Sequence, residues 1–82
     1  MAVTPIVHLN GSARDALIAM RVNAYGKLNE AYDAIKAMAP NGRDYYLEDG
    51  RFERAVEEHD ARLRAIDSII ADLESEINEL DA

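Results

Sequence analysis

A seven-residue repeat of apolar side chains constrains this chain more than any other feature. Between residues 52 and 80, apolar side chains recur in alternating steps of four and three. The repeat consists of Phe52, Val56, His59, Leu63, Ile66, Ile70, Leu73, Ile77 and Leu80, with His59 as its one polar member. Its average period of 3.5 residues is typical of a helix that packs on another helix with a left-handed crossing. The repeat therefore predicts a helix over residues 50–81 with a single apolar seam.

The preceding segment predicts the partner helix. Between Ser12 and Pro40 the segment contains no proline and a single glycine, Gly26. Ser12, with Asp15 three residues later, forms a capping-box arrangement, and Pro40 cannot continue a helix. We therefore expect a helix over residues 13–39.

A ten-residue loop, 40–49, joins the two predicted helices. Within it, Asn41-Gly42 is interpreted as a helix stop with a left-handed residue. The fold expected for residues 12–82 is an all-α, antiparallel two-helix hairpin with coiled-coil-like packing. Pairing the helices about this loop places Ala24 near Ile66; the same register sets Ala31 near His59 and Leu17 near Leu73.

Residues 1–11 are expected to form an extended N-terminal arm, because β-branched residues and a proline dominate residues 3–9. Three apolar side chains of the arm are candidate partner-binding residues: Ile6, Val7 and Leu9. Three placements are open. The arm covers its own hairpin, crosses to a neighbouring chain, or adds a strand to the sheet of a partner.

The apolar face of helix 13–39 is too broad for one partner helix. Its core stripe is flanked by a second stripe that includes Ile18, Val22 and Tyr25. A chain of 82 residues without cysteine has a thin core and no disulfide to strengthen it. We therefore expect this stripe to contact other protein chains, in a homo-oligomer or a larger assembly.

Two adjacent loop tyrosines, Tyr45 and Tyr46, are the remaining apolar candidates. Tyrosine is a frequent anchor of protein interfaces. Alternatively, the two rings cap the end of the hairpin against Met38 and Phe52. Each ring can also take one of these roles.

The charge of the chain is concentrated in its second half. The net charge is −7, and residues 41–82 carry −8 of it against +1 for residues 1–40. This balance disfavours direct binding to nucleic acid, which requires a basic surface. Acids at seven-residue spacing, among them Asp67, Glu74 and Asp81, form an acidic face along helix 50–81. That face is either solvated or a docking surface for a basic partner.

No motif indicates catalysis, a cofactor, a metal or a small-molecule substrate. His59 fits a buried core position, where it could meet Tyr32, and Val56 replaces the glutamate that a di-iron Glu-x-x-His motif needs. The loop lacks the calcium-binding spacing of an EF-hand. No apolar run is long enough for a membrane span, and the N-terminus does not resemble a signal peptide. We therefore expect a non-enzymatic, intracellular protein.

Two segments, Pro5–Ser12 and Ala39–Tyr46, resemble small helical-hairpin proteins of tailed bacteriophages and prophages. The resemblance implies a phage origin, a role in the virion or its assembly, and residence in the host cytoplasm while the particle forms. It supplies no activity. The alternative function is a small acidic regulator or inhibitor that binds a basic surface of a host protein.

Overall fold

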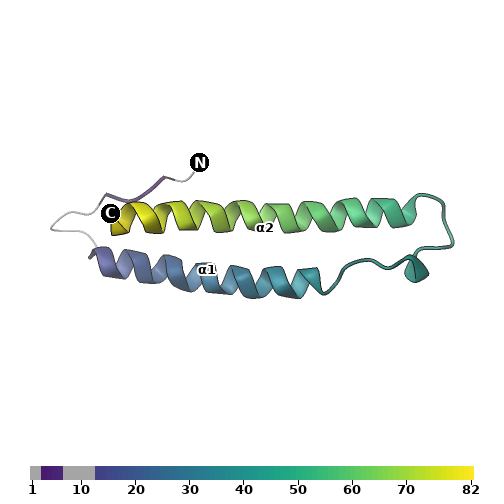
Figure 1. The fold of residues 1–82 in the computed structure, drawn as a ribbon, viewed down its shortest axis with the longest axis horizontal. Helices are drawn as coiled ribbons and strands as arrows, with labels where there is room; N and C mark the ends of the chain where they lie inside the picture. Colours follow the sequence, from purple (N-terminus) through teal and green to yellow (C-terminus); the bar gives the residue numbers. More distant parts are fainter. Residues whose placement is uncertain (1–2, 7–12) are drawn as a thin grey trace.

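The computed structural model, which describes residues 3–6 and 13–82, contains two long helices packed antiparallel (Figure 1). Helix α1 spans Arg14–Lys36 and helix α2 spans Arg51–Asp81. A short 3-10 helix, η1, lies in the connection at Gly42–Asp44. The molecule measures 62 × 21 × 17 Å, and the described residues contain no strand. The expected all-α hairpin is confirmed.

The ends of α1 differ from the expected ones. The N-terminal cap is Ala13, whose side chain accepts no hydrogen bond, and Ser12 lies outside the described residues. The α-helix stops at Lys36, three residues before the expected end. A tighter, 3-10-type turn follows, in which the amide of Ala39 donates to the carbonyl oxygen of Lys36 over 3.2 Å. The helix ends there because Pro40 disfavours helical geometry in the residue before it.

The connection places its left-handed residue elsewhere than expected. Asn41 has an extended backbone, and its side-chain oxygen accepts from the amide of Arg43, which caps η1. Gly42 does not have a positive φ; Gly50 does, at 80°, as the N-cap of α2. The prediction of a left-handed stop at Asn41-Gly42 is therefore wrong, since the turn of the chain is completed just before α2.

The register between the helices also differs from the expected one. Arg21 contacts Glu76, and Tyr25 contacts Glu74. Ala24 therefore lies level with residues 74–76 and not with Ile66, a shift of about one heptad. The apolar repeat is unchanged by such a shift, so the pattern alone could not exclude it.

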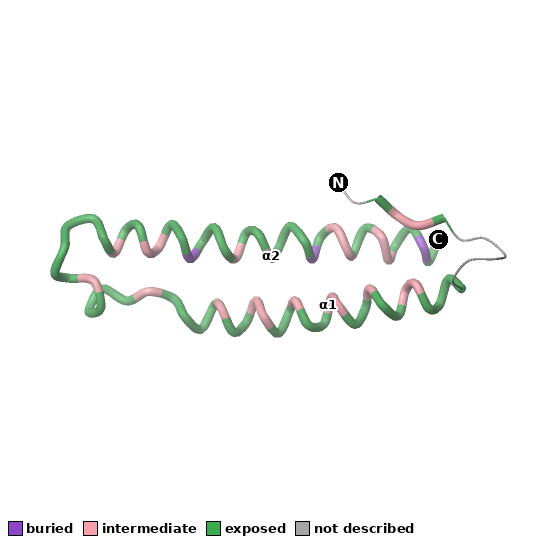
Figure 2. Tube along the Cα trace, turned by 180° about the vertical axis from the view of Figure 1, so that it is seen from behind, coloured by how far each residue is buried: buried purple, intermediate pink, exposed green. Residues whose placement is uncertain are grey.

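Little of the described chain is buried. Its buried side chains are His59, Ile70 and Leu80, all in α2 (Figure 2). His59 is thus a buried seam residue, as expected, although no hydrogen bond joins it to Tyr32 among the described residues. The other seam residues are half-buried, because one helix covers only one side of each.

Residues 3–6 form neither helix nor strand and are drawn beside the C-terminal end of α2, on the side away from α1 (Figures 1 and 2). Thr4 and Pro5 are half-buried, whereas Val3 and Ile6 are exposed.

Candidate functional site

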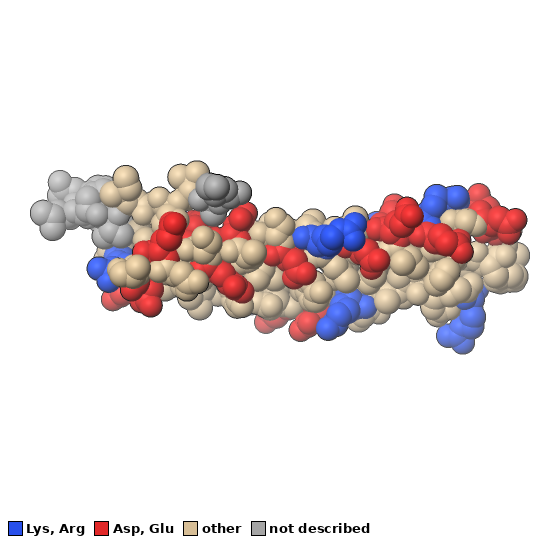
Figure 3. Space-filling model, turned by 45° about the horizontal axis from the view of Figure 1, so that its top comes forward, with Lys and Arg blue, Asp and Glu red and all other residues tan. Residues whose placement is uncertain are grey.

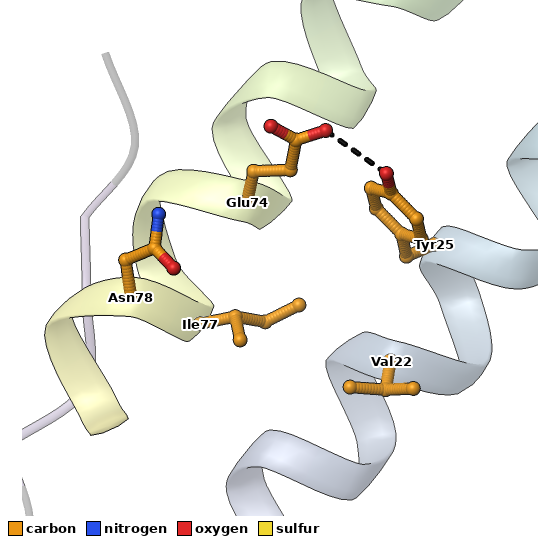
Figure 4. A pocket seen from close by; sticks show the side chains of 5 residues that line it. All are labelled: Val22, Tyr25, Glu74, Ile77 and Asn78. Atoms are coloured by element: carbon orange, nitrogen blue, oxygen red, sulfur yellow. Dashed lines mark hydrogen bonds between the residues drawn. The ribbon is translucent and has the colours of Figure 1, made fainter.

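A hollow of about 420 Å³ lies between the helices in the half of the hairpin that contains the C-terminus of α2 (Figure 4). Val22 and Tyr25 line it from α1, and Glu74, Ile77 and Asn78 line it from α2. The three α2 residues share one flank of the seam because they lie within four positions of one another along the helix. The hollow is mainly apolar, with polar groups along its rim.

The rim is fixed by a hydrogen bond across the helices. The Tyr25 hydroxyl donates to Oε1 of Glu74 over 3.0 Å (Figure 4). This bond to Glu74, and the negative charge of its carboxylate, raise the pKa of Tyr25 above its ordinary value. Asn29 Nδ2 donates to the backbone carbonyl of Tyr25 over 2.9 Å. The hydrogen bond to Glu74 therefore positions the Tyr25 ring as one wall of the hollow.

A half-buried ion pair lies next to the hollow. Arg21 Nε donates to Glu76 Oε1 over 2.9 Å, and the side chains are 18% and 13% exposed. Arg21 Nη1 also donates to the carbonyl oxygen of Leu17 over 3.0 Å. Arg21 interrupts the apolar stripe of α1, and the structure supplies the reason: its charge is paired with an acid of α2.

A second polar cluster stabilises the loop at the other end of the hairpin. Glu48 accepts from Arg51 Nε over 2.6 Å and pairs with Arg54 over 3.4 Å. Arg51, more than Arg54, holds the pKa of the Glu48 carboxyl below its ordinary value. These exposed contacts join the end of the connection to the first turn of α2.

The two loop tyrosines take different roles in the structure. Tyr45 packs on Phe52, with ring centroids 6.3 Å apart and planes tilted by 46°. Tyr46 is 77% exposed, and Met38 is 64% exposed. Tyr45 therefore caps the hairpin end, while Tyr46 stays available for a partner.

The structure brings together only part of the predicted contact surface. Ile18, Val22 and Tyr25 lie on one flank of α1; Val22 is exposed, and the other two are half-buried. Ile6 is exposed. Val7 and Leu9 lie outside the described residues.

The acidic face is exposed as expected. Asp67, Glu74 and Asp81 are all in contact with solvent. Acidic atoms lie along the whole length of the face shown in Figure 3, and basic atoms lie among them, mostly from the middle of the hairpin to its loop end. Of the three acids, only Glu74 makes a hydrogen bond to the described chain, through Tyr25.

Sequence reasoning missed two members of the hollow, Ile77 and Asn78. The heptad repeat predicts Ile77 only as a seam residue, and no sequence pattern predicts a role for Asn78. The pairing of Arg21 with an acid of α2 could have been found, since a cation inside an apolar stripe requires a partner. In the observed register that partner is Glu76, while Glu74 accepts from Tyr25.

The described residues contain no group of three or more His, Asp or Glu side chains placed to hold a metal ion. Neither described helix is both long and apolar enough to cross a membrane.

The fold defines this protein as an elongated, two-helix, all-α hairpin with an open apolar flank. No protein-family model matches the chain, and neither the curated proteins nor the solved structures contain a match to it.

Proposed function

We propose that this protein is a non-enzymatic structural or interaction protein that works inside an assembly of protein chains. The observation that carries the proposal is its exposed surface. The chain has a solvent-accessible area of 6224 Å², whereas a compact monomer of its mass exposes about 4,900 Å². The excess includes apolar side chains at Met20, Val22, Ile69 and Leu47.

The chemistry of the hollow supports a role in binding another protein. Its walls are two aliphatic side chains, one tyrosine ring, one amide and one carboxylate. Such a surface receives an apolar side chain of a partner and offers a hydrogen-bonding rim to the surrounding backbone.

A pull-down with the immobilised chain tests this role. Val22→Asp places a charge at the mouth of the hollow and is expected to abolish capture of the partner, whereas Lys27→Ala on the other flank of α1 is the control. Equal capture by both variants would contradict docking through the hollow.

The resemblance of Pro5–Ser12 and Ala39–Tyr46 to phage hairpin proteins supports a narrower proposal, that the assembly is a phage particle or an intermediate of its formation. Mass spectrometry of purified virions tests this. Absence of the protein from particles and from assembly intermediates would overturn the phage assignment and leave the general role intact.

The acidic end of the hairpin supports a second candidate function, inhibition or regulation of a host protein through a basic surface. Asp67 and Asp81 are exposed and make no ion pair within the described chain. The two functions differ in their response to salt. Binding driven by charge weakens steeply between about 20 and 200 mM salt, because over roughly this range the Debye length falls below the spacing of surface charges. Binding driven by apolar contacts does not weaken in this way.

A further inference from the structure

We infer that the partner of the open flank is a second copy of this chain, and that two hairpins form a four-helix bundle with their loops at the same end. This inference rests on the proposed function and names its first partner. It requires a surface of sufficient area, a contiguous apolar patch and complementary charges.

The elongated hairpin exposes more surface than a compact monomer, as a chain that packs on a second copy would. The surface of the chain exceeds that of a compact monomer by about 1,300 Å². Two copies that bury this excess would lose about 2,600 Å² in total, which lies in the range of obligate homodimers. The radius of gyration, 18.1 Å, also exceeds the value of about 12 Å for a compact chain of this length.

The patch is contiguous on one flank only. Val22, Tyr25 and Ile77 line the hollow, and Ile18 lies one helical turn before Val22 on the same stripe of α1. Elsewhere on the helices, the exposed apolar residues Met20 and Ile69 lie far apart along the hairpin, and Met38 lies in the connection after α1. A second hairpin laid on the first flank covers the hollow with its own aliphatic side chains.

The charges select the orientation. With the loops at the same end, α1 of each copy lies antiparallel on α2 of the other. With the loops at opposite ends, α2 would lie on α2. The acidic rows, including Asp60, Asp67 and Asp81, would then face each other and repel.

The loops-together arrangement pairs opposite charges at both ends. In the observed register, Arg14 lies level with the end of α2 near Asp81, and Lys36 lies level with the turn that contains Asp60. All four side chains are exposed, and none forms an ion pair within the described chain. Lys36 Nζ lies 5.8 Å from the centre of the Tyr32 ring, a contact that leaves its charge without an acidic partner.

Analytical ultracentrifugation tests this surface with a matched pair of variants. The dimer dissociation constant is measured at micromolar to about 100 µM concentrations of protein. Val22 and Ile69 are 51% and 48% exposed, on opposite flanks. Val22→Asp should raise the dimer dissociation constant by at least about tenfold, because it buries an unpaired carboxylate, whereas Ile69→Asp should change it by less than about twofold. The reverse order would overturn the choice of flank, and helicity measured by circular dichroism confirms that both variants fold.

Cross-linking tests the orientation, because the chain has no cysteine and is 62 Å long. Asp44→Cys places one thiol in the exposed loop. A bis-maleimide linker that spans ~10 Å is much shorter than a helix of 20 residues. It therefore joins two such chains only if their loops lie together. A mixture of Asp44→Cys and Ala82→Cys chains is the control. Preferred linkage between the loop of one chain and the end of the other would overturn the loops-together bundle.

Charge reversal on separate chains tests the pairing. One chain carries Lys36→Glu and the other carries Asp60→Lys. Each variant alone should dimerise more weakly than the wild type, and the mixture should recover the mass of a dimer. No recovery on mixing would overturn the pairing between copies. A wild-type chain that is monomeric at about 100 µM, a concentration at the weak end of homodimer affinities, would overturn the whole inference. The pull-down tests the proposed function separately.

Discussion

At the scale of single residues, the Arg21–Glu76 ion pair decides which register the hairpin adopts. The apolar seam repeats every seven residues, so sliding one helix by a heptad preserves most apolar contacts. The ion pair is formed in one register only, and it is too little exposed for water to replace it without cost. A polar contact of this kind adds specificity to a seam that the apolar residues leave degenerate.

Removing one partner of this pair should destabilise the hairpin. We expect Arg21→Ala or Glu76→Ala to lower the free energy of unfolding by about 1–3 kcal/mol, because the remaining charge loses a charge-assisted hydrogen bond. The double variant Arg21→Leu with Glu76→Leu should recover most of the loss. Urea unfolding followed by circular dichroism measures all three, and unchanged stability in both single variants would contradict the role of the pair.

The Tyr25–Glu74 contact predicts a dependence on alkaline pH. The pKa of Tyr25 is raised in the folded protein, so the folded state holds this proton more tightly than the unfolded state. The contribution is therefore fully present below pH 10, the ordinary value for tyrosine, and is lost as the pH rises through the raised pKa. Tyr25→Phe lacks the titrating group and should not show this component.

Urea midpoints from about pH 8 to pH 11.5, a window that brackets the ordinary tyrosine value of about 10, measure the effect. The midpoint of the wild type should fall further over this range than that of Tyr25→Phe. Tyr46→Phe is the matched control, because its exposed ring makes no hydrogen bond to the described chain. Parallel curves for the wild type and Tyr25→Phe would show that the Tyr25–Glu74 bond does not form in solution.

At the scale of helices, two glycines should respond in opposite directions to the same substitution. Gly26 lies within α1, where a methyl group added to its Cα would meet open space, whereas Gly50 caps α2 with φ 80°. Gly26→Ala should stabilise the protein by about 1 kcal/mol, the difference in helix propensity. Gly50→Ala should destabilise it by about 1–2 kcal/mol, because a side chain strains left-handed geometry.

Thermal unfolding of the two variants measures this contrast. Gly42→Ala is a control for the loop, since Gly42 has no positive φ and nothing lies within 4 Å of a Cβ added there. A Gly50→Ala variant as stable as Gly42→Ala would mean that α2 does not begin at the left-handed residue.

The helices could be predicted from the sequence, but their relation to each other could not. The repeat from Phe52 to Leu80 is set by which side chains avoid water, and so it is visible without a partner. The register depends on which contacts are made across the seam, and the repeat is indifferent to a slip of seven residues. The end of α1 at Lys36 differs from the expected one for another reason: the effect of Pro40 reaches back over three residues, which form a tighter, 3-10-type turn.

The candidate site was predictable to the same extent. Ile18, Val22 and Tyr25 follow from the width of the apolar stripe, which is local to one helix. Ile77 and Asn78 join them only because the register brings α2 opposite. A hollow between two helices is a property of their pairing, so residues on the second helix could not be assigned before the register was known.

At the scale of the whole molecule, the hairpin is long because each helix has only one neighbour. Most of the stability of a helix in a protein comes from packing of its apolar face, and here even the seam of α2 is largely half-buried. Lengthening such a hairpin adds contacts and exposed surface in proportion, so the fraction buried does not improve. A second pair of helices encloses the seam without lengthening the chain.

This arrangement predicts that the thermal midpoint depends on protein concentration. A dimer gains about 1.4 kcal/mol of stability for each tenfold rise in concentration. For a folding unit of two such chains this corresponds to about 3–6 °C. The midpoint of the wild type should rise by that amount between about 5 and about 50 µM, because this tenfold change in concentration corresponds to about 1.4 kcal/mol.

Val22→Asp should melt at a lower temperature with a midpoint independent of concentration, while Ile69→Asp should keep the concentration dependence of the wild type. A flat response of the wild type would mean that the hairpin folds alone, with its apolar flank exposed until a different chain covers it.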